Sequence, residues 1–221
     1  MSLFERIKPG IVFRAIEFSA RAHRGQYRKG TRLPYFSHPM NAASILIRAG
    51  ATDEMVAAAI LHDTVEDTPV TIMEIKREFG SDVGRMVAAA TEKPKVFASW
   101  KERKNEHVGH IPKLAEDEAA VICADKLDNI LSILTDINEK KEEFAQHNLE
   151  AYSEGSESLL NRRRDHYMSV FERFRAPYHE LEWYYRSLAE AFAAYPFSNR
   201  LYKRIAERFA DAVNNVFILT D

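Results

Sequence analysis

The sequence predicts an all-α fold: a helical bundle followed by additional C-terminal helices. Apolar residues recur at helical spacing along most of the 221 residues, and strand-like alternation between turn pairs is not evident. Start and stop signals frame two segments, with Pro39 before Gly50 and a Thr71 capping pattern before Gly80. A hydrophobic content of 46% is enough for a buried core.

Composition excludes several classes of protein. No window approaches the roughly 20 apolar residues that a membrane-spanning helix needs, and Cys123, the only cysteine, lies among apolar neighbours. We therefore expect a cytoplasmic protein with an inert core thiol and no membrane partner. A net charge of −2 and a pI of about 6.5 argue against a nucleic-acid partner.

Along the chain, the first unusual segment is a basic one, "GQYRKGTRLPYFSHP" at residues 25–39. No acidic residue occurs between Glu17 and Asp53, although six basic residues do. They are Arg21, Arg24, Arg28, Lys29, Arg32 and Arg48. On a nearly neutral protein this distribution predicts one lobe of positive potential that meets an anion. The alternative is a solvated basic face.

The next segment combines an apolar helix with a cluster of acids. Residues Met55 to Leu61 are all apolar, which predicts burial on every side, yet His62, Asp63, Glu66 and Asp67 follow directly. Two unit charges 4 Å apart repel by about 4 kcal/mol at an effective dielectric of 20. The cluster therefore needs a cation, either an arginine or a divalent metal, and a histidine beside carboxylates favours the metal. A solvent-exposed helix end conflicts with the apolar run.

A second core helix, residues 118–137, carries a polar stripe. Its polar residues are spaced by four, three and four positions: Asp125, Asn129, Ser132 and Asp136. A conservative interpretation is the wet edge of an amphipathic helix. A buried stripe would need partners, which the earlier acid-rich segment and a metal would supply.

The last third of the chain differs in composition. "YSEGSESLLNRRRD", residues 152–165, has the composition of a loop leading to a charged helix start. Two aromatic-rich amphipathic helices are expected over residues 180–197 and 199–219. We therefore divide the chain into a core, residues 1–137, and a helical extension, residues 138–221. The extension either packs on the core or forms an oligomer contact, so a homodimer is possible.

Four ordered blocks carry a family resemblance: "YRKGTRLPYFSHP", "AAAILHDTVEDT", "EIKREFGSDV" and "ADKLDN". In order and spacing they resemble the hydrolase domain of the RelA/SpoT family, including its single-domain members, over residues 10–137. That domain belongs to the HD phosphohydrolases. The resemblance implies an HD-domain helical bundle holding one Mn²⁺, with another divalent transition metal possible. The implied ligands are His38, His62, Asp63 and Asp125.

The resemblance also implies roles for residues outside the ligand set. Glu66 and Asp67 match the catalytic acid pair. The substrate-binding positions are Arg28, which packs against the guanine base, Lys29 beside it, and Asn129 and Ser132 near the ribose and phosphate. The sequence departs from the family at Asp128, where His or Tyr is usual, and after Ile137, where the usual C-terminal pattern is not followed.

The implied activity is removal of the 3′-diphosphate from guanosine tetra- or pentaphosphate, which gives GDP or GTP and diphosphate. One alternative is an HD phosphohydrolase acting on a different nucleotide, such as NADPH or a nucleoside phosphate. Another is a non-catalytic nucleotide-binding module, against which the complete ligand set and acid pair argue. His107 and His110 have no matching acidic block, so we expect them to be surface or structural residues.

Overall fold

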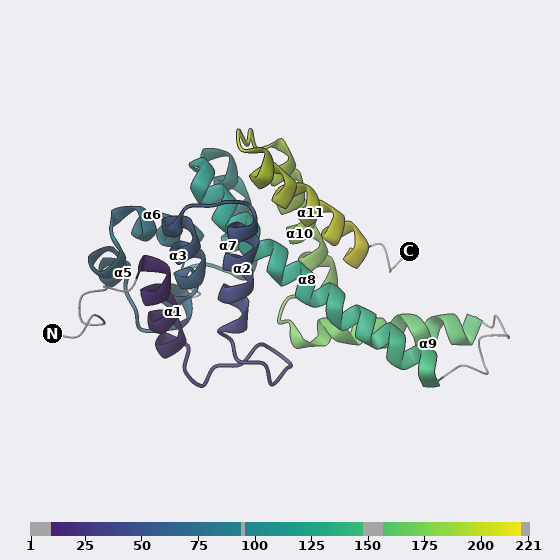
Figure 1. The fold of residues 1–221 in the computed structure, drawn as a ribbon. Coiled ribbons are helices and arrows are strands. Elements are labelled where there is room, and N and C mark those ends of the chain that lie inside the picture. Colours follow the sequence, from purple (N-terminus) through teal and green to yellow (C-terminus); the bar gives the residue numbers. More distant parts are fainter. Residues whose placement is uncertain (1–9, 94–95, 148–156, 218–221) are drawn as a thin grey trace.

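A computed structural model describes residues 10–93, 96–147 and 157–217 (Figure 1). These residues are helical, with no strand among them beyond an isolated bridge between Tyr27 and Pro34. The α-helices are α1 (Ile11–Ala22), α2 (Ser37–Arg48), α3 (Asp53–Leu61), α4 (Thr64–Asp67), α5 (Ile72–Phe79), α6 (Ser81–Ala90), α7 (Trp100–His110), α8 (Glu116–His147), α9 (Glu157–Met168), α10 (Tyr178–Ala194) and α11 (Arg200–Phe217). Two short 3-10 helices are η2 (Ile111–Lys113) and η4 (Ser169–Arg173). The predicted all-α class is confirmed.

The predicted start and stop signals lie at helix ends. Thr71 accepts a hydrogen bond from the Glu74 backbone while Glu74 reaches back to the Thr71 backbone, a complete capping box. Gly80 ends α5 with a φ of +94°, in the left-handed region that favours glycine. Pro39 lies in the first turn of α2. Local sequence therefore determines where these helices begin and end.

The core surrounds α3, as its apolar composition predicts. Every residue from Met55 to Leu61 is buried, and α3 packs against α1, α2, α6 and α8. Cys123, on α8, is also fully buried, and burial raises the pKa of its thiol, as expected for an inert core cysteine. None of the described helices combines the length and apolarity required to cross a bilayer.

The 32-residue helix α8 connects the two predicted halves of the chain (Figure 1). Its N-terminal part packs against α2, α3 and α6, while α11 packs along it and α10 packs against α11. The division that we predict after Ile137 falls inside this helix, so the two units share one continuous element. The division, like the possible homodimer, remains a prediction.

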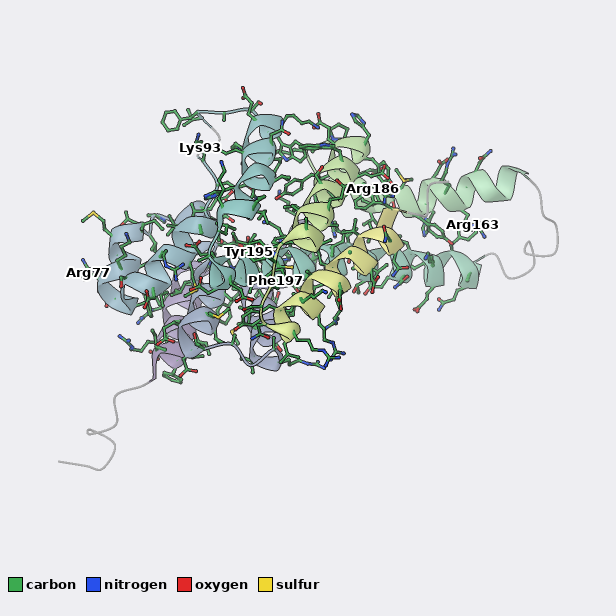
Figure 2. The ribbon with its side chains drawn as sticks, turned by 90° about the horizontal axis from the view of Figure 1, so that it is seen from above. Arg77, Lys93, Arg163, Arg186, Tyr195 and Phe197 are labelled. Carbon is green, nitrogen blue, oxygen red and sulfur yellow. The ribbon has the colours of Figure 1, made fainter. Side chains whose placement is uncertain are left out.

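Beyond the body of the molecule, α8 and α9 form a projecting antiparallel hairpin (Figure 1), on which Arg163 lies (Figure 2). Residues 157–165 belong to α9, so the prediction of a loop over residues 152–165 is wrong for them; residues 152–156 lie outside the described residues. Packing against α8 explains the difference, because the Phe144 ring contacts the rings of His166 and Tyr167. Tertiary contacts here outweigh local composition.

The turn between α10 and α11 is fastened to the start of α8. The Tyr195 hydroxyl donates to the Leu114 carbonyl over 2.9 Å, and the Ser198 hydroxyl and the Asn199 backbone N–H donate to Glu116 over 2.6 and 2.8 Å. The rings of Tyr195 and Phe197 pack against each other at this turn, tilted by 48° with their centroids 4.5 Å apart (Figure 2). The extension is thus attached to the core by polar contacts as well as apolar packing.

Replacing Phe209 with alanine should lower the free energy of unfolding by about 3–5 kcal/mol, because its fully buried ring packs edge-on against Phe192. Urea denaturation measures the change. Arg208→Ala, an exposed change on the same helix, is the matched control and should stay within about 0.5 kcal/mol. A loss for Phe209→Ala that is no larger than that of the control would contradict the packing of α11 into the core.

Candidate active site and metal centre

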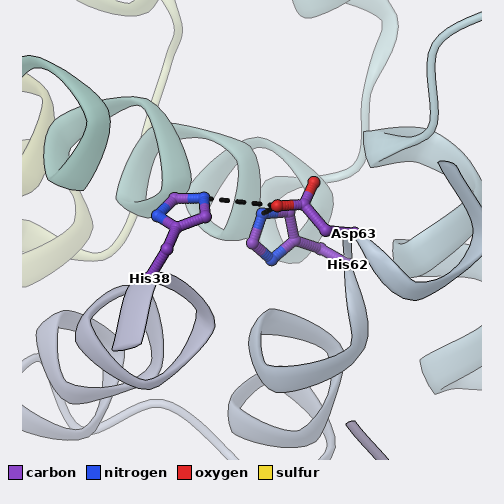
Figure 3. Close-up of side chains that lie close together, drawn as sticks. All are labelled: His38, His62 and Asp63. Carbon is purple, nitrogen blue, oxygen red and sulfur yellow. Dashed lines mark ion pairs between the residues drawn. The ribbon is translucent and has the colours of Figure 1, made fainter. Parts of the chain in front are cut away.

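Three helices bring four predicted ligands together at one point. His38 is the second residue of α2, His62 and Asp63 lie in the turn between α3 and α4, and Asp125 lies on α8. Because α2, α3 and α8 pack against one another, these side chains meet inside the core. Figure 3 shows three of them, His38, His62 and Asp63. Both imidazoles are only 2% exposed, so their charges must be balanced locally.

The donor atoms of these residues surround a common point. His38 Nε2 lies 3.4 Å from Asp63 Oδ2 and 3.1 Å from Asp125 Oδ1, and His62 Nε2 lies 3.2 Å and 3.4 Å from the same two oxygens. The nitrogens of the two histidines and an oxygen of Asp63 all lie within 4.8 Å of one another. Bonds of about 2.0–2.2 Å to a shared ion would leave neighbouring donors at this separation.

The far side of each imidazole is held by an acceptor. His62 Nδ1 donates to the Ala59 carbonyl over 2.7 Å, and His38 Nδ1 lies 2.6 Å from Asp128 Oδ2. Both Nε2 atoms are therefore free to offer a lone pair to the cluster. His62 Nε2 is buried without a hydrogen-bond partner among the described residues. The residues thus fit a divalent metal ion, for which imidazole and carboxylate are suitable ligands.

Protonation balances the cluster when no other cation is present. Burial lowers the pKa of His62, but Asp63 and Asp125 outweigh burial and hold that pKa well above its usual value. Burial likewise raises the pKa of Asp125, but Lys126 and His62 outweigh it and hold that pKa well below the usual range. The Lys126 ammonium lies 2.7 Å from Asp125 Oδ2. A divalent ion would therefore compete with protons for these imidazoles.

Next to the cluster, α4 carries the predicted acid pair. The side chain of Glu66 is exposed at the cavity, but desolvation by the surrounding protein, followed by the charges of Glu92 and Asp63, raises its pKa. Glu66 therefore holds a proton more readily than a glutamate free in water. Asp67 accepts a hydrogen bond from the Tyr35 hydroxyl over 3.1 Å, and the same hydroxyl lies 2.6 Å from Asp63 Oδ2. Tyr35 therefore connects the acid pair with the ligand cluster.

A cavity of about 250 Å³ opens beside the acid pair. It is lined by all the predicted substrate-binding and catalytic residues, namely Arg28, Lys29, Glu66, Asp67, Asn129 and Ser132. Arg28 donates to Asn129 Oδ1 over 3.2 Å, and Asn129 Nδ2 donates to Asp125 Oδ1 over 2.7 Å. The polar stripe of α8 is thus connected by hydrogen bonds both to the basic loop, residues 25–39, and to the ligand cluster.

A larger cavity, about 500 Å³, lies between the end of α6 and α7 and contains none of the predicted site residues. His107 lines it, but its ring is held by the Tyr184 hydroxyl at 3.0 Å and lies 3.4 Å from Glu92. His107 is buried within these contacts, which agrees with the structural role expected for it.

Several residues of the site escaped sequence reasoning. The cavity is also lined by Arg173, Phe174 and Tyr185, all from the C-terminal extension. Arg173 pairs with Asp136, the last residue of the predicted polar stripe. The Arg173 side chain also passes close to Gly30: a Cβ atom at position 30 would lie 3.1 Å from the Arg173 Cδ. Aromatic enrichment of the last third was the only sequence signal for this wall.

Comparison with known proteins gives one matching family and several relatives. An HD domain model matches residues 15–154. A guanosine-3′,5′-bis(diphosphate) 3′-pyrophosphohydrolase, MESH1 of Homo sapiens, is 39% identical over 153 residues, which cover 66% of this chain and 80% of that protein. A protein of the same enzyme name from Aquifex aeolicus is 36% identical over 146 residues, or 63% of this chain, but this region is only 20% of its length.

Solved structures agree with the fold. The crystal structure of lmo0812 from Listeria monocytogenes is 31% identical, with a TM-score of 0.62 over 84% of this chain and 96% of that chain. The structure of a metazoan ortholog of SpoT, described as hydrolysing ppGpp, is 23% identical, with a TM-score of 0.58 over 92% of this chain and 95% of that chain. At this identity the second likeness concerns the fold alone.

Two substitutions distinguish the role of the ligand cluster from the role of the acid pair. Asp125→Asn should lower the content of divalent metal after dialysis at least about tenfold, because the amide removes a charge facing both imidazoles. Glu66→Gln should keep the metal of the wild type, since Glu66 makes none of the contacts of the cluster described above. Elemental analysis gives the metal content, and circular dichroism checks the fold. Equal losses in the two variants would place Glu66 among the ligands.

Proposed function

The chain belongs to the HD domain family and to its RelA/SpoT-type branch, and we propose that it is a metal-dependent phosphohydrolase of guanosine tetra- or pentaphosphate. The reaction removes the 3′-diphosphate and yields GDP or GTP and diphosphate. The observation that carries the proposal is that the acid pair and the basic loop line one cavity, which hydrogen bonds through Asn129 and Tyr35 connect to the histidine–aspartate cluster. Relatives named for this activity support it.

The basic loop gives the cavity the charge that a nucleotide requires. Arg28, Lys29 and Arg173 all line the cavity, and each is a cation that can pair with phosphate oxygens. The Arg28 guanidinium lies 6.0 Å from the centre of the Tyr35 ring, so it is already part of an aromatic contact. We assign to its other face the stacking of the guanine base. Asn129 and Ser132 face the ribose in this arrangement.

We assign Mn²⁺ to the cluster of His38, His62, Asp63 and Asp125. Two imidazoles and two carboxylates are ligands that a divalent transition metal accepts. When bound, the ion supplies Lewis-acid stabilisation of phosphoryl charge and a source of hydroxide at neutral pH. The hydrogen bonds from His62 to Ala59 and from Asn129 to Asp125 keep these donors oriented before the ion arrives.

Glu66 carries the proton of the reaction in this proposal. The bond that breaks joins the ribose 3′ oxygen to phosphorus; the oxygen of a water molecule forms the new bond to phosphorus, and one proton passes to the departing 3′ oxygen. A glutamate with a raised pKa suits this transfer, because it takes up a proton more readily than an ordinary glutamate and can still release it. Asp67, fixed by the Tyr35 hydroxyl, orients Glu66 and the water.

A nucleotide panel tests the activity. Wild-type protein with Mn²⁺ should release diphosphate from guanosine tetraphosphate faster than it cleaves the adenosine analogue, NADPH or nucleoside triphosphates. Chelation should stop the reaction, and Glu66→Gln should lower turnover about 10²- to 10⁴-fold. An enzyme that leaves guanosine tetraphosphate intact but cleaves NADPH or another nucleotide would refute the substrate assignment and keep the phosphohydrolase class. A protein that binds these nucleotides and cleaves none would be a binding module.

Arg28→Ala should weaken the binding of guanosine tetraphosphate by about 1–2 kcal/mol, the contribution of a stacked cation, and this loss should appear mainly in KM. The metal content should be unchanged. Steady-state kinetics separates KM from kcat. Arg77→Ala is the matched control, because Arg77 is exposed on α5 and does not line the cavity (Figure 2). A fall in kcat at constant KM would mean that Arg28 acts in the chemical step and does not hold the base.

A further inference from the structure

We propose that Asp128 is a positioning residue of the metal centre, whose carboxylate fixes the ring of His38 so that Nε2 points at the ligand cluster. Nothing in the motifs assigns this role to Asp128. The inference rests on the metal centre of the proposed function and is independent of which nucleotide the enzyme cleaves.

The geometry places His38 between two carboxylates from one turn of α8. Asp128 follows Asp125 by three residues, so the two side chains leave the helix on the same face. Asp128 Oδ2 lies 2.6 Å from His38 Nδ1, and Asp125 Oδ1 lies 3.1 Å from His38 Nε2. Asp128 and His38 are both buried, so water does not compete for this hydrogen bond.

The chemistry of the pair determines which nitrogen can bind a cation. A carboxylate only accepts hydrogen bonds, so His38 Nδ1 carries the proton that it donates to Asp128. A neutral imidazole has one N–H, and Nε2 then keeps its lone pair for the cluster. The negative charge of the acceptor also makes Nε2 a stronger donor than it would be beside a neutral acceptor. Asp128 therefore sets both the orientation and the donor strength of His38.

The second histidine provides an internal comparison. His62 Nδ1 donates to the Ala59 backbone carbonyl over 2.7 Å, so its ring is oriented by a neutral acceptor that no side-chain substitution can remove. The two imidazoles of the cluster are thus held in different ways. Of the two Nδ1 atoms, only that of His38 is held by a side chain, so the orientation of His38 depends on the residue at position 128.

A direct substrate contact does not explain Asp128. Its side chain does not line the cavity that holds Arg28, Asn129 and Ser132, and it is buried against His38. The resemblance leads us to expect His or Tyr at this position, and neither supplies a negative charge beside His38. The carboxylate of Asp128 therefore faces His38 and does not face the cavity.

Metal affinity tests the proposal without reference to catalysis. Isothermal titration of metal-stripped protein with Mn²⁺ should give a Kd about 10- to 100-fold weaker for Asp128→Ala than for wild type. Asp128→Asn keeps the shape of the side chain and should also bind more weakly. Asp128→Glu should recover part of the loss. Asp136→Asn is the matched control, since Asp136 lies on the same helix, pairs with Arg173 and should leave Mn²⁺ affinity unchanged.

A spectroscopic readout separates positioning from general loss of structure. In wild-type protein loaded with Zn²⁺ as a diamagnetic probe, a ¹H–¹⁵N spectrum of labelled histidine should show the His38 Nδ1–H protected from exchange. In Asp128→Ala that signal should be lost to exchange while the His62 Nδ1–H signal persists. Loss of both signals would indicate a disrupted cluster and would overturn the proposal.

The outcomes distinguish this inference from the assigned activity. Folded Asp128→Ala and Asp128→Asn variants that bind Mn²⁺ within about twofold of wild type would overturn the positioning role. A wild type that binds no Mn²⁺ would overturn it together with the metal centre. A wild type that binds Mn²⁺ tightly, loses affinity in both variants and cleaves nothing in the nucleotide panel would support the role of Asp128 while refuting the proposed function.

Discussion

The attraction between two buried imidazoles and two carboxylates, where α2, α3 and α8 meet, constrains the rest of the structure. Each of these groups would cost several kcal/mol to bury alone, so none of the three helices can shift without leaving a charge uncompensated. The apolar run Met55–Leu61 anchors one side of this junction in the core, and His62 and Asp63 follow at its end. The packing of the core and the geometry of the site therefore depend on the same positions of these three helices.

The helix α8 connects the cluster with the cavity. Asp125 faces the cluster, Asn129 bridges it to Arg28, and Asp136 pairs with Arg173 further along the same stripe. A helical stripe holds its residues at fixed spacing, so the distance from the histidine–aspartate cluster to the cavity is set by the helix itself. The extension packs on the same helix, and its aromatic residues complete the wall of the pocket.

The parts of the site that could be predicted from the sequence are polar residues placed in otherwise apolar helices. Acids at the end of an all-apolar helix and a polar stripe on a core helix needed partners, and the structure brings both groups together. Tyr35 and Lys126 were missed, because their partners depend on the path of the basic loop and on the rotation of α8, which no local pattern encodes. The helical state of residues 157–165 was missed for a similar reason: contacts of the α8 residue Phe144 with α9 outweigh the serine-rich composition.

Because the Arg173 side chain passes close to Gly30, these two positions, which are far apart in the sequence, have to be substituted together. Gly30 has a φ of +73°, and the Arg173 stem occupies the space where its side chain would lie. A side chain at position 30 would require the Arg173 side chain to move by a few tenths of an ångström or to be replaced by a shorter one. Redesign of the cavity for a bulkier or smaller ligand would have to alter the loop around Gly30 and the C-terminal extension together.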